Sequence, residues 1–206
     1  MTPLVDHDLV SCLMVTQASR WADGPPIGVL AYQAQSYSAR ELVIVTSDPC
    51  DEMDTVGFDV LLMPKGSSLG AMRQRAVQMS SGAYVATWDD DDRPHYRRLE
   101  EQIATLAAMP LADACLLLRV TIDDQINGRQ FTGPLHAWEM TMVARRESVG
   151  VYPDTMLGED SAVIRRMKQV VVLDRPELYV HTAHPGSTFG KKLVAEWFAN
   201  RTGGPL

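Results

Sequence analysis

Short, almost uninterrupted apolar runs recur through the first half of the chain, and they constrain its fold more than any other feature. The runs lie at Val10–Thr16, Glu41–Thr46, Val60–Met63 and Ala83–Trp88. Runs of this length that are rich in β-branched residues are typical of strands buried on both faces of a sheet. The sequence therefore predicts at least these strands.

Segments with helical spacing of apolar residues separate the runs. Ile27, Leu30, Ala31 and Ala34 recur at such spacing, and a helix is predicted over Leu69–Ser80. Strand–helix–strand alternation of this kind predicts an α/β fold with a mostly parallel central sheet, flanked by helices on both faces.

The second half of the chain has a different pattern. Pro94 is expected in the first turn of a helix that Leu99, Ile103 and Leu106 mark. A mixed, smaller portion is expected after this helix, on the same domain. Its predicted elements are strands at Ala114–Ile122 and Met140–Ala144, with a turn at Asn127–Gly128 between them.

Nothing in the sequence separates two domains. The chain has 206 residues without an internal repeat or a linker-like segment, so a single domain over residues 1–206 is expected. Its hydrophobic fraction of 46% is enough for a sizeable core. The net charge of -7 argues against a protein that coats nucleic acid, because such a protein needs a basic face.

The cysteines and the hydropathy pattern bear on location. Cys12, Cys50 and Cys115 are far apart, odd in number and without metal-ligand spacing, which favours a reducing compartment. The first residues lack the features of a secretory signal, and no apolar run approaches the roughly 18 residues of a membrane span. A cytoplasmic protein without an integral membrane span is expected.

Four consecutive carboxylates, Asp89 to Asp92, directly follow the apolar run at Ala83–Trp88. A charge run is most often a solvated loop. This run, however, follows the carboxyl end of a predicted buried strand, where open α/β sheets bind ligands. Carboxylate oxygens suit Mg²⁺ or Mn²⁺, which usually also contact substrate phosphates. On position alone, a solvated loop is the more common interpretation, and a divalent metal site is the alternative.

Several further motifs stand in a fixed order along the chain. They are Gln35-Ser36-Tyr37 before Glu41–Val45, the Leu69–Ala76 helix, Ser81–Ala86 leading into the aspartates, Gly158-Glu159-Asp160 before Arg165 and Arg166, and His184–Thr188. This ordered set resembles the family 2 glycosyltransferases, which have the GT-A fold. The resemblance spans most of the chain.

The resemblance implies a metal-dependent, inverting glycosyltransferase. The implied donor is a nucleotide-diphosphate sugar, with a UDP-sugar as the first expectation, and the acceptor is a hydroxyl of a glycan or another molecule. Residues 1–110 are the implied nucleotide-sugar-binding half and residues 111–206 the acceptor and catalytic half. The implied metal ligands are Asp91, Asp89 and His184, and His181 is the rival of His184.

The resemblance also implies contacts to the donor. Either Asp48 or Ser47 corresponds to the acid that the family has after the second strand, and the loop after Thr16 lacks the family's common Tyr-Asn. Asp90 either supports the nucleotide or simply tolerates exposure. An arginine on a helix face, such as Arg73, is more often a solvated surface group. The expected nucleotide-sugar-binding residues are Thr16, Ser47, Asp48, Lys65, Arg73, Asp89 and Asp90.

Asp160 is the implied general base that removes the proton of the acceptor hydroxyl, and Glu159 is the alternative. Both acids also suit the start of a helix, where the helix dipole favours negative charge. Trp138 and His136 are expected in a loop before a strand, where an aromatic ring stacks on a sugar. Core packing is the slightly favoured interpretation of Trp138.

Two other functions compete with sugar transfer. A nucleotidyltransferase is expected to have a Gly-rich phosphate loop early in the chain, and Gly24-Pro25-Pro26 is not such a loop. A non-catalytic nucleotide- or carbohydrate-binding module is the second rival. Oligomerisation is possible through Phe189–Phe198, whose apolar residues share one helical face and either cover the core or contact a partner chain.

Overall fold

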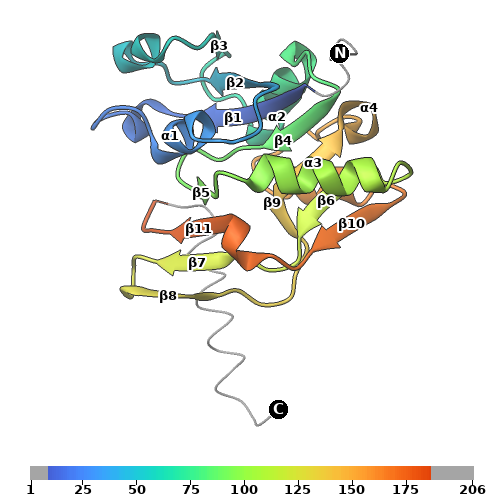
Figure 1. Ribbon diagram of the computed structural model, residues 1–206. Helices are drawn as coiled ribbons and strands as arrows, with labels where there is room; N and C mark the ends of the chain where they lie inside the picture. The colour runs from blue at the N-terminus through green and yellow to red at the C-terminus, as the bar shows by residue number, and fades with distance from the viewer. Residues whose placement is uncertain (1–8, 187–206) are drawn as a thin grey trace.

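The computed structural model describes residues 9–186, apart from the side chains of residues 55 and 56, and contains two β-sheets with helices packed on them (Figure 1). The main sheet has seven strands in the order β10-β6-β9-β4-β1-β2-β3. Within it, β9 runs antiparallel to β4 and β6, and the other neighbouring strands are parallel. The predicted α/β fold with a mostly parallel sheet is confirmed.

The strands predicted in the first half are all present. They are β1 (Val10–Thr16), β2 (Arg40–Thr46), β3 (Val60–Leu62) and β4 (Tyr84–Thr87). Strand β1 lies between β2 and β4, and alternate residues of β1 enter apolar clusters on opposite faces of the sheet. This burial on both faces explains why its sequence shows no polar–apolar alternation.

Helices cover both faces of the main sheet. One face is covered by α1 (Ile27–Gln33) and α3 (Arg98–Ala108), whose Val29 and Leu99 share an apolar cluster with Cys12 of β1. The opposite face is covered by α2 (Leu69–Met79) and α5 (Glu159–Ile164), whose Met72 and Val163 pack with Leu13. A short helix, α4 (Arg146–Val149), follows β9.

The second sheet corrects two expectations. Ala114–Ile122 is not one strand: β6 (Ala114–Leu117) belongs to the main sheet and β7 (Thr121–Asp124) to the second. The segment resembles one strand in sequence because Leu117, Val120 and Ile122 all enter a third apolar cluster, between the sheets. The remaining strands are β8 (Arg129–Thr132), β9 (Trp138–Arg145), β10 (Val170–Leu173) and β11 (Tyr179–Ala183).

Pro94 is the second correction. It lies in β5 (Arg93–Pro94), which pairs with β11 at the edge of the second sheet, and α3 begins only at Arg98. An edge strand tolerates proline because one of its sides needs no backbone donor. The predicted turn at Asn127–Gly128 is confirmed between β7 and β8, with Gly128 at a φ of 64°.

The topology fixes where a ligand is expected to bind. From β1 the chain continues outward to β2 and β3, and it then returns to place β4 on the other side of β1 (Figure 1). Such a switch point opens a crevice at the carboxyl ends of the strands. The acidic run follows β4 at this point. No helix in the described part of the chain has the length and apolarity to cross a bilayer, and the segment Phe189–Phe198 lies outside that part.

Candidate active site at the carboxyl edge of the main sheet

The four carboxylates of the acidic run face different partners. Asp89 contacts Arg73, Asp90 contacts Thr16, Asp91 contacts Arg20 and His184, and Asp92 contacts Tyr179, His181 and Thr182. The partners come from both halves of the chain. The mutual repulsion of the run is therefore offset by separate sets of donors, and the solvated-loop interpretation is wrong for Asp90 and Asp92, which are buried.

Asp90 connects the run to the end of β1. Its carboxylate accepts a hydrogen bond of 2.6 Å from the Thr16 hydroxyl, which in turn accepts one of 2.9 Å from the Trp21 indole. Burial raises the pKa of Asp90 to about 7, although the Thr16 hydrogen bond opposes the shift. Asp90 is only 6% exposed, so the expectation that it simply tolerates exposure is wrong.

Gly28 of α1 holds the backbone of the run. Its N–H donates to the Asp90 carbonyl at 2.9 Å, and a Cβ at this position would lie 2.4 Å from the Asp89 carbonyl oxygen. The helix therefore approaches the run as closely as only glycine allows.

Gly28→Ala is expected to destabilise the protein by about 1–3 kcal/mol, because the methyl group must push the Asp89–Asp90 backbone away. Urea unfolding measures this change. Leu30→Ala, on the exposed face of the same helix, is the control and should shift stability by only about 0.5 kcal/mol. Equal stability of Gly28→Ala and wild type would contradict the close contact.

Asp91 and His184 lie together, as the resemblance implies for metal ligands. His184 Nε2 is 2.9 Å from Asp91 Oδ2, and both side chains are partly exposed. The guanidinium of Arg20 contacts both: Nη2 is 2.9 Å from Asp91 Oδ2 and Nη1 is 2.8 Å from His184 Nε2. Over residues 9–186, no group of three or more His, Cys, Asp or Glu side chains has the arrangement of a metal site.

Asp92 and His181 form a buried pair that sequence reasoning missed. Asp92 accepts hydrogen bonds from the Tyr179 hydroxyl at 2.8 Å and from the Thr182 N–H at 2.7 Å, and His181 Nδ1 lies 3.0 Å away. Burial opposes the charge of Asp92, but these partners hold its pKa below the ordinary value. Burial likewise opposes protonation of His181, but Asp92 raises its pKa to about 9.

The sequence contains a signal for this pair. Tyr179 and His181 are two residues apart in a strand, so their side chains lie on the same face of β11 and both reach Asp92. The pair attaches the acidic run to β11, and His184 follows β11 directly. His181 is thus engaged with Asp92, and His184 is the histidine that faces Asp91.

Arg73 joins the acidic run to α5. Its Nε lies 3.1 Å from Glu159, and its Nη2 lies 3.1 Å from Asp160 and 3.4 Å from Asp89. Arg73 is only 6% exposed, so the interpretation as a solvated surface group is wrong. Three carboxylates around one guanidinium compensate for the cost of burying that charge.

Asp160 and Glu159 differ in environment, although they are neighbours in sequence. Glu159 is buried and bonded to Arg73 Nε, whereas the Asp160 side chain is 16% exposed. Burial raises the pKa of Asp160 to about 7, which Arg73 opposes and Glu159 and Asp89 reinforce. Burial also raises the pKa of Asp89, to about 6. Asp160 therefore has the properties of a group that exchanges protons near neutral pH.

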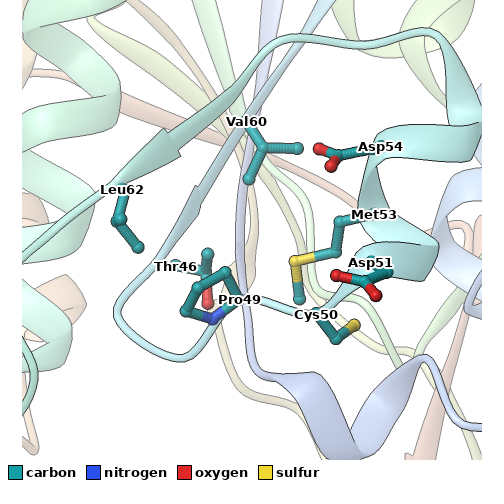
Figure 2. Close-up of a pocket in the computed structure, with 8 residues that line it drawn as sticks. All are labelled: Thr46, Pro49, Cys50, Asp51, Met53, Asp54, Val60 and Leu62. Atoms are coloured by element: carbon teal, nitrogen blue, oxygen red, sulfur yellow. The ribbon is translucent and has the colours of Figure 1, made fainter.

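A pocket lies beside the expected nucleotide contacts at the ends of β2 and β3. Its volume is about 290 Å³. Figure 2 shows the side chains that line it, among them Thr46 and Met53. Ser47 is partly buried next to it, while Asp48 and Lys65 are exposed. The Asp48 carbonyl accepts a hydrogen bond from Ala18, which attaches this loop to the end of β1. The pocket is lined by Thr46, Pro49, Cys50, Asp51, Met53, Asp54, Val60 and Leu62.

The expected acceptor contacts lie at the start of β9. Trp138 is the first residue of β9 rather than a loop residue, and it is 3% exposed within the third apolar cluster, as core packing requires. His136 is exposed, its ring lies edge-on to Trp138, and it contacts Glu139 at 3.4 Å. Glu139 also accepts a hydrogen bond from Ser161 of α5, which connects this region to Asp160.

The sequence and the structure both have counterparts among known proteins. Residues 35–168, more than half of the chain, match the profile described as Glycosyl transferase family 2. TarS from S. aureus (residues 1–349 with UDP) superposes with a TM-score of 0.65 at 17% identity, covering 86% of this chain and 61% of TarS. The TarS complex with UDP-GlcNAc superposes with a TM-score of 0.65 at 16% identity, and the match covers 87% of this chain and 60% of TarS.

A second solved structure is the mannosyltransferase PcManGT from Pyrobaculum calidifontis in complex with GDP-Man and Mn²⁺. It gives a TM-score of 0.61 at 17% identity, covering 96% of this chain and 65% of PcManGT. At such identities the likeness concerns the fold, and the GT-A fold implied by the resemblance is confirmed. The chain spans less than two thirds of the length of either protein. Among curated proteins, none matches this sequence.

Proposed function

Because the chain belongs to glycosyl transferase family 2, we propose that it transfers a sugar from a nucleotide-diphosphate sugar to a hydroxyl of an acceptor. One observation carries this proposal: Arg73 bonds both Asp89 of the acidic run and Asp160 of α5 at the carboxyl edge of the main sheet. A carboxylate suited to proton transfer thus neighbours the acids that follow β4. Proton removal and donor binding can then occur side by side.

The nucleotide is proposed to bind along the carboxyl ends of β1, β2 and β4. The pocket beside Thr46 supports this assignment, with Ser47 or Asp48 contacting the base or ribose and Lys65 a phosphate. The TarS structures hold UDP or UDP-GlcNAc and the PcManGT structure holds GDP-Man. A UDP-sugar is therefore the first donor to test and a GDP-sugar the second. Residues 1–110 are proposed as the donor half and residues 111–206 as the acceptor half.

Asp91 and His184 are proposed to hold a divalent metal ion, Mn²⁺ or Mg²⁺. Their Oδ2 and Nε2 atoms are 2.9 Å apart, close to the roughly 3 Å between adjacent ligands of one octahedral ion. Carboxylate and imidazole are both ligands that Mn²⁺ accepts, and the PcManGT complex contains Mn²⁺. When bound, the metal supplies positive charge that stabilises the departing diphosphate. Asp89 is proposed to contact the donor beside it.

Asp160 is proposed as the general base. Its Oδ2 bonds Arg73, whereas Oδ1 is buried and has no hydrogen-bond partner within the described residues, so this acceptor stays unsatisfied until a hydroxyl reaches it. A pKa of about 7 suits a base that works near neutral pH. Attack by the activated hydroxyl on the side opposite the leaving group inverts the anomeric configuration. His136 is the proposed sugar contact, and Trp138 supports it from the core.

Asp91→Asn is expected to reduce metal-dependent transfer by about 10²-fold or more, because the amide is a weaker ligand for the ion that stabilises the diphosphate. The measurement is release of nucleoside diphosphate from UDP- and GDP-sugars with and without Mn²⁺. Glu147→Gln, an exposed acid of α4 at the opposite edge of the main sheet, is the control.

Two outcomes would contradict the proposed function. Unchanged turnover of Asp91→Asn would mean that the metal binds elsewhere. Release of inorganic pyrophosphate from a nucleoside triphosphate and a sugar 1-phosphate, without release of a nucleoside diphosphate from the UDP- or GDP-sugars, would indicate nucleotidyl transfer. A cytoplasmic location is also proposed, because Cys12, Cys50 and Cys115 are free thiols and Cys12 and Cys115 are buried.

A further inference from the structure

Arg20 contacts the two atoms that are assigned to the metal. Its Nη2 lies 2.9 Å from Asp91 Oδ2 and its Nη1 lies 2.8 Å from His184 Nε2, while those two atoms are themselves 2.9 Å apart. One guanidinium therefore spans the carboxylate–imidazole pair. Its Nε also lies 3.8 Å from Asp90, so its charge compensates for the neighbouring acid as well.

The position of Arg20 in the fold allows the guanidinium to leave. Arg20 is the last residue of a single 3-10 turn, Ala18–Arg20, directly after β1. Its side chain is 23% exposed and that of Asp91 is 21% exposed, so the contact lies at the surface of the crevice. In contrast, the side chain of Arg73, on the other side of the run, is only 7% exposed and is held by three carboxylates.

We propose that Arg20 is a resident counter-ion of the Asp91–His184 pair and is displaced when a divalent cation binds. The inference rests on the metal site of the proposed function. A guanidinium and a metal ion cannot both occupy the position beside Asp91 Oδ2 and His184 Nε2. The apparent metal affinity is therefore the intrinsic affinity multiplied by the fraction of molecules in which Arg20 does not hold the pair. The free protein then keeps its acids neutralised before the metal-bound donor arrives.

Arg20→Met is expected to bind Mn²⁺ alone about tenfold more tightly than wild type, because the competitor for both ligand atoms is gone. Free Mn²⁺ measured by electron paramagnetic resonance in titrations of the full chain gives the affinity. Arg20→Gln serves as a second variant if Arg20→Met does not fold. The thermal midpoint gives an independent readout, since Mn²⁺ should raise it more in Arg20→Met than in wild type.

Two controls separate displacement from a general change in charge. Arg93→Met removes an exposed positive charge next to the acidic run without touching the pair, and it should change Mn²⁺ affinity by less than about twofold. Asp91→Asn in the Arg20→Met background should remove the gain. A gain of equal size in Arg93→Met would overturn the inference.

The outcomes also distinguish the inference from the function on which it rests. Mn²⁺ binding that depends on Asp91 but is unchanged or weaker in Arg20→Met would overturn the displacement and leave the metal site intact. No Mn²⁺ binding in wild type, Arg20→Met or Arg20→Gln would overturn both. Tighter binding in Arg20→Met, together with no sugar transfer by wild type from any donor tested, would support the displacement and overturn the function.

Discussion

Asp160→Asn is expected to bind the sugar donor normally and to lose transfer by about 10²–10⁴-fold in kcat, the usual contribution of a general base. The amide preserves the shape of the side chain but cannot remove the acceptor proton. Folding should be retained, because Arg73 keeps its contacts with Glu159 and Asp89. Donor affinity by calorimetry and initial rates of transfer measure the two effects separately.

Glu159→Gln is the matched comparison. Glu159 is buried and bonded to Arg73 Nε, so its loss should lower stability more than it lowers the rate of the chemical step. The opposite pattern, with full activity in Asp160→Asn and none in Glu159→Gln, would transfer the role of base to Glu159. Weak donor binding by Asp160→Asn would instead make Asp160 a binding residue.

The pH dependence offers a second readout for Asp160. A base works only when deprotonated, and burial raises the pKa of Asp160 to about 7. The rate of transfer in wild type should therefore fall as the pH is lowered through about 7, rather than through the value near 4 of an ordinary aspartate. A rate that stays level down to pH 5 would contradict a raised pKa at the base.

Arg73→Met is expected to destabilise the fold by about 3–5 kcal/mol at pH 8, because it leaves three neighbouring carboxylates without their shared cation. The pKa values of Asp89 and Asp160, already raised to about 6 and about 7, should rise further when the guanidinium is removed. Between pH 4 and those values the folded state binds more protons than the unfolded chain, so stability falls as the pH rises.

The expected decrease of stability with rising pH can be tested directly. The loss of unfolding free energy in Arg73→Met, measured with urea, should be larger at pH 8 than at pH 5. Arg75→Met, on the exposed side of the same helix, is the matched control and should shift stability by about 0.5 kcal/mol or less. A loss in Arg73→Met that does not vary with pH would mean that lost packing, not uncompensated charge, causes the destabilisation.

The sequence predicted most of the main sheet because its signals are local. The runs at Val10–Thr16 and Glu41–Thr46 contain enough β-branched and apolar residues to be recognised without knowing their neighbours. Such signals do not show which sheet a strand joins. Ala114–Ile122 therefore looked like one strand, although its two parts pair with different partners, and Pro94 looked like a helix start although it lies on a sheet edge.

By itself, the sequence determined that four acids follow a buried strand of an α/β sheet and that a family 2 motif surrounds them. The tertiary structure decided what each acid faces: Asp89 is paired with Arg73, Asp91 with Arg20 and His184, and Asp92 with His181. The physical reason is distance along the chain. Apolar periodicity reports on near neighbours, whereas each of these charge pairs forms only when separate strands and helices close around the carboxyl ends of β1 and β4.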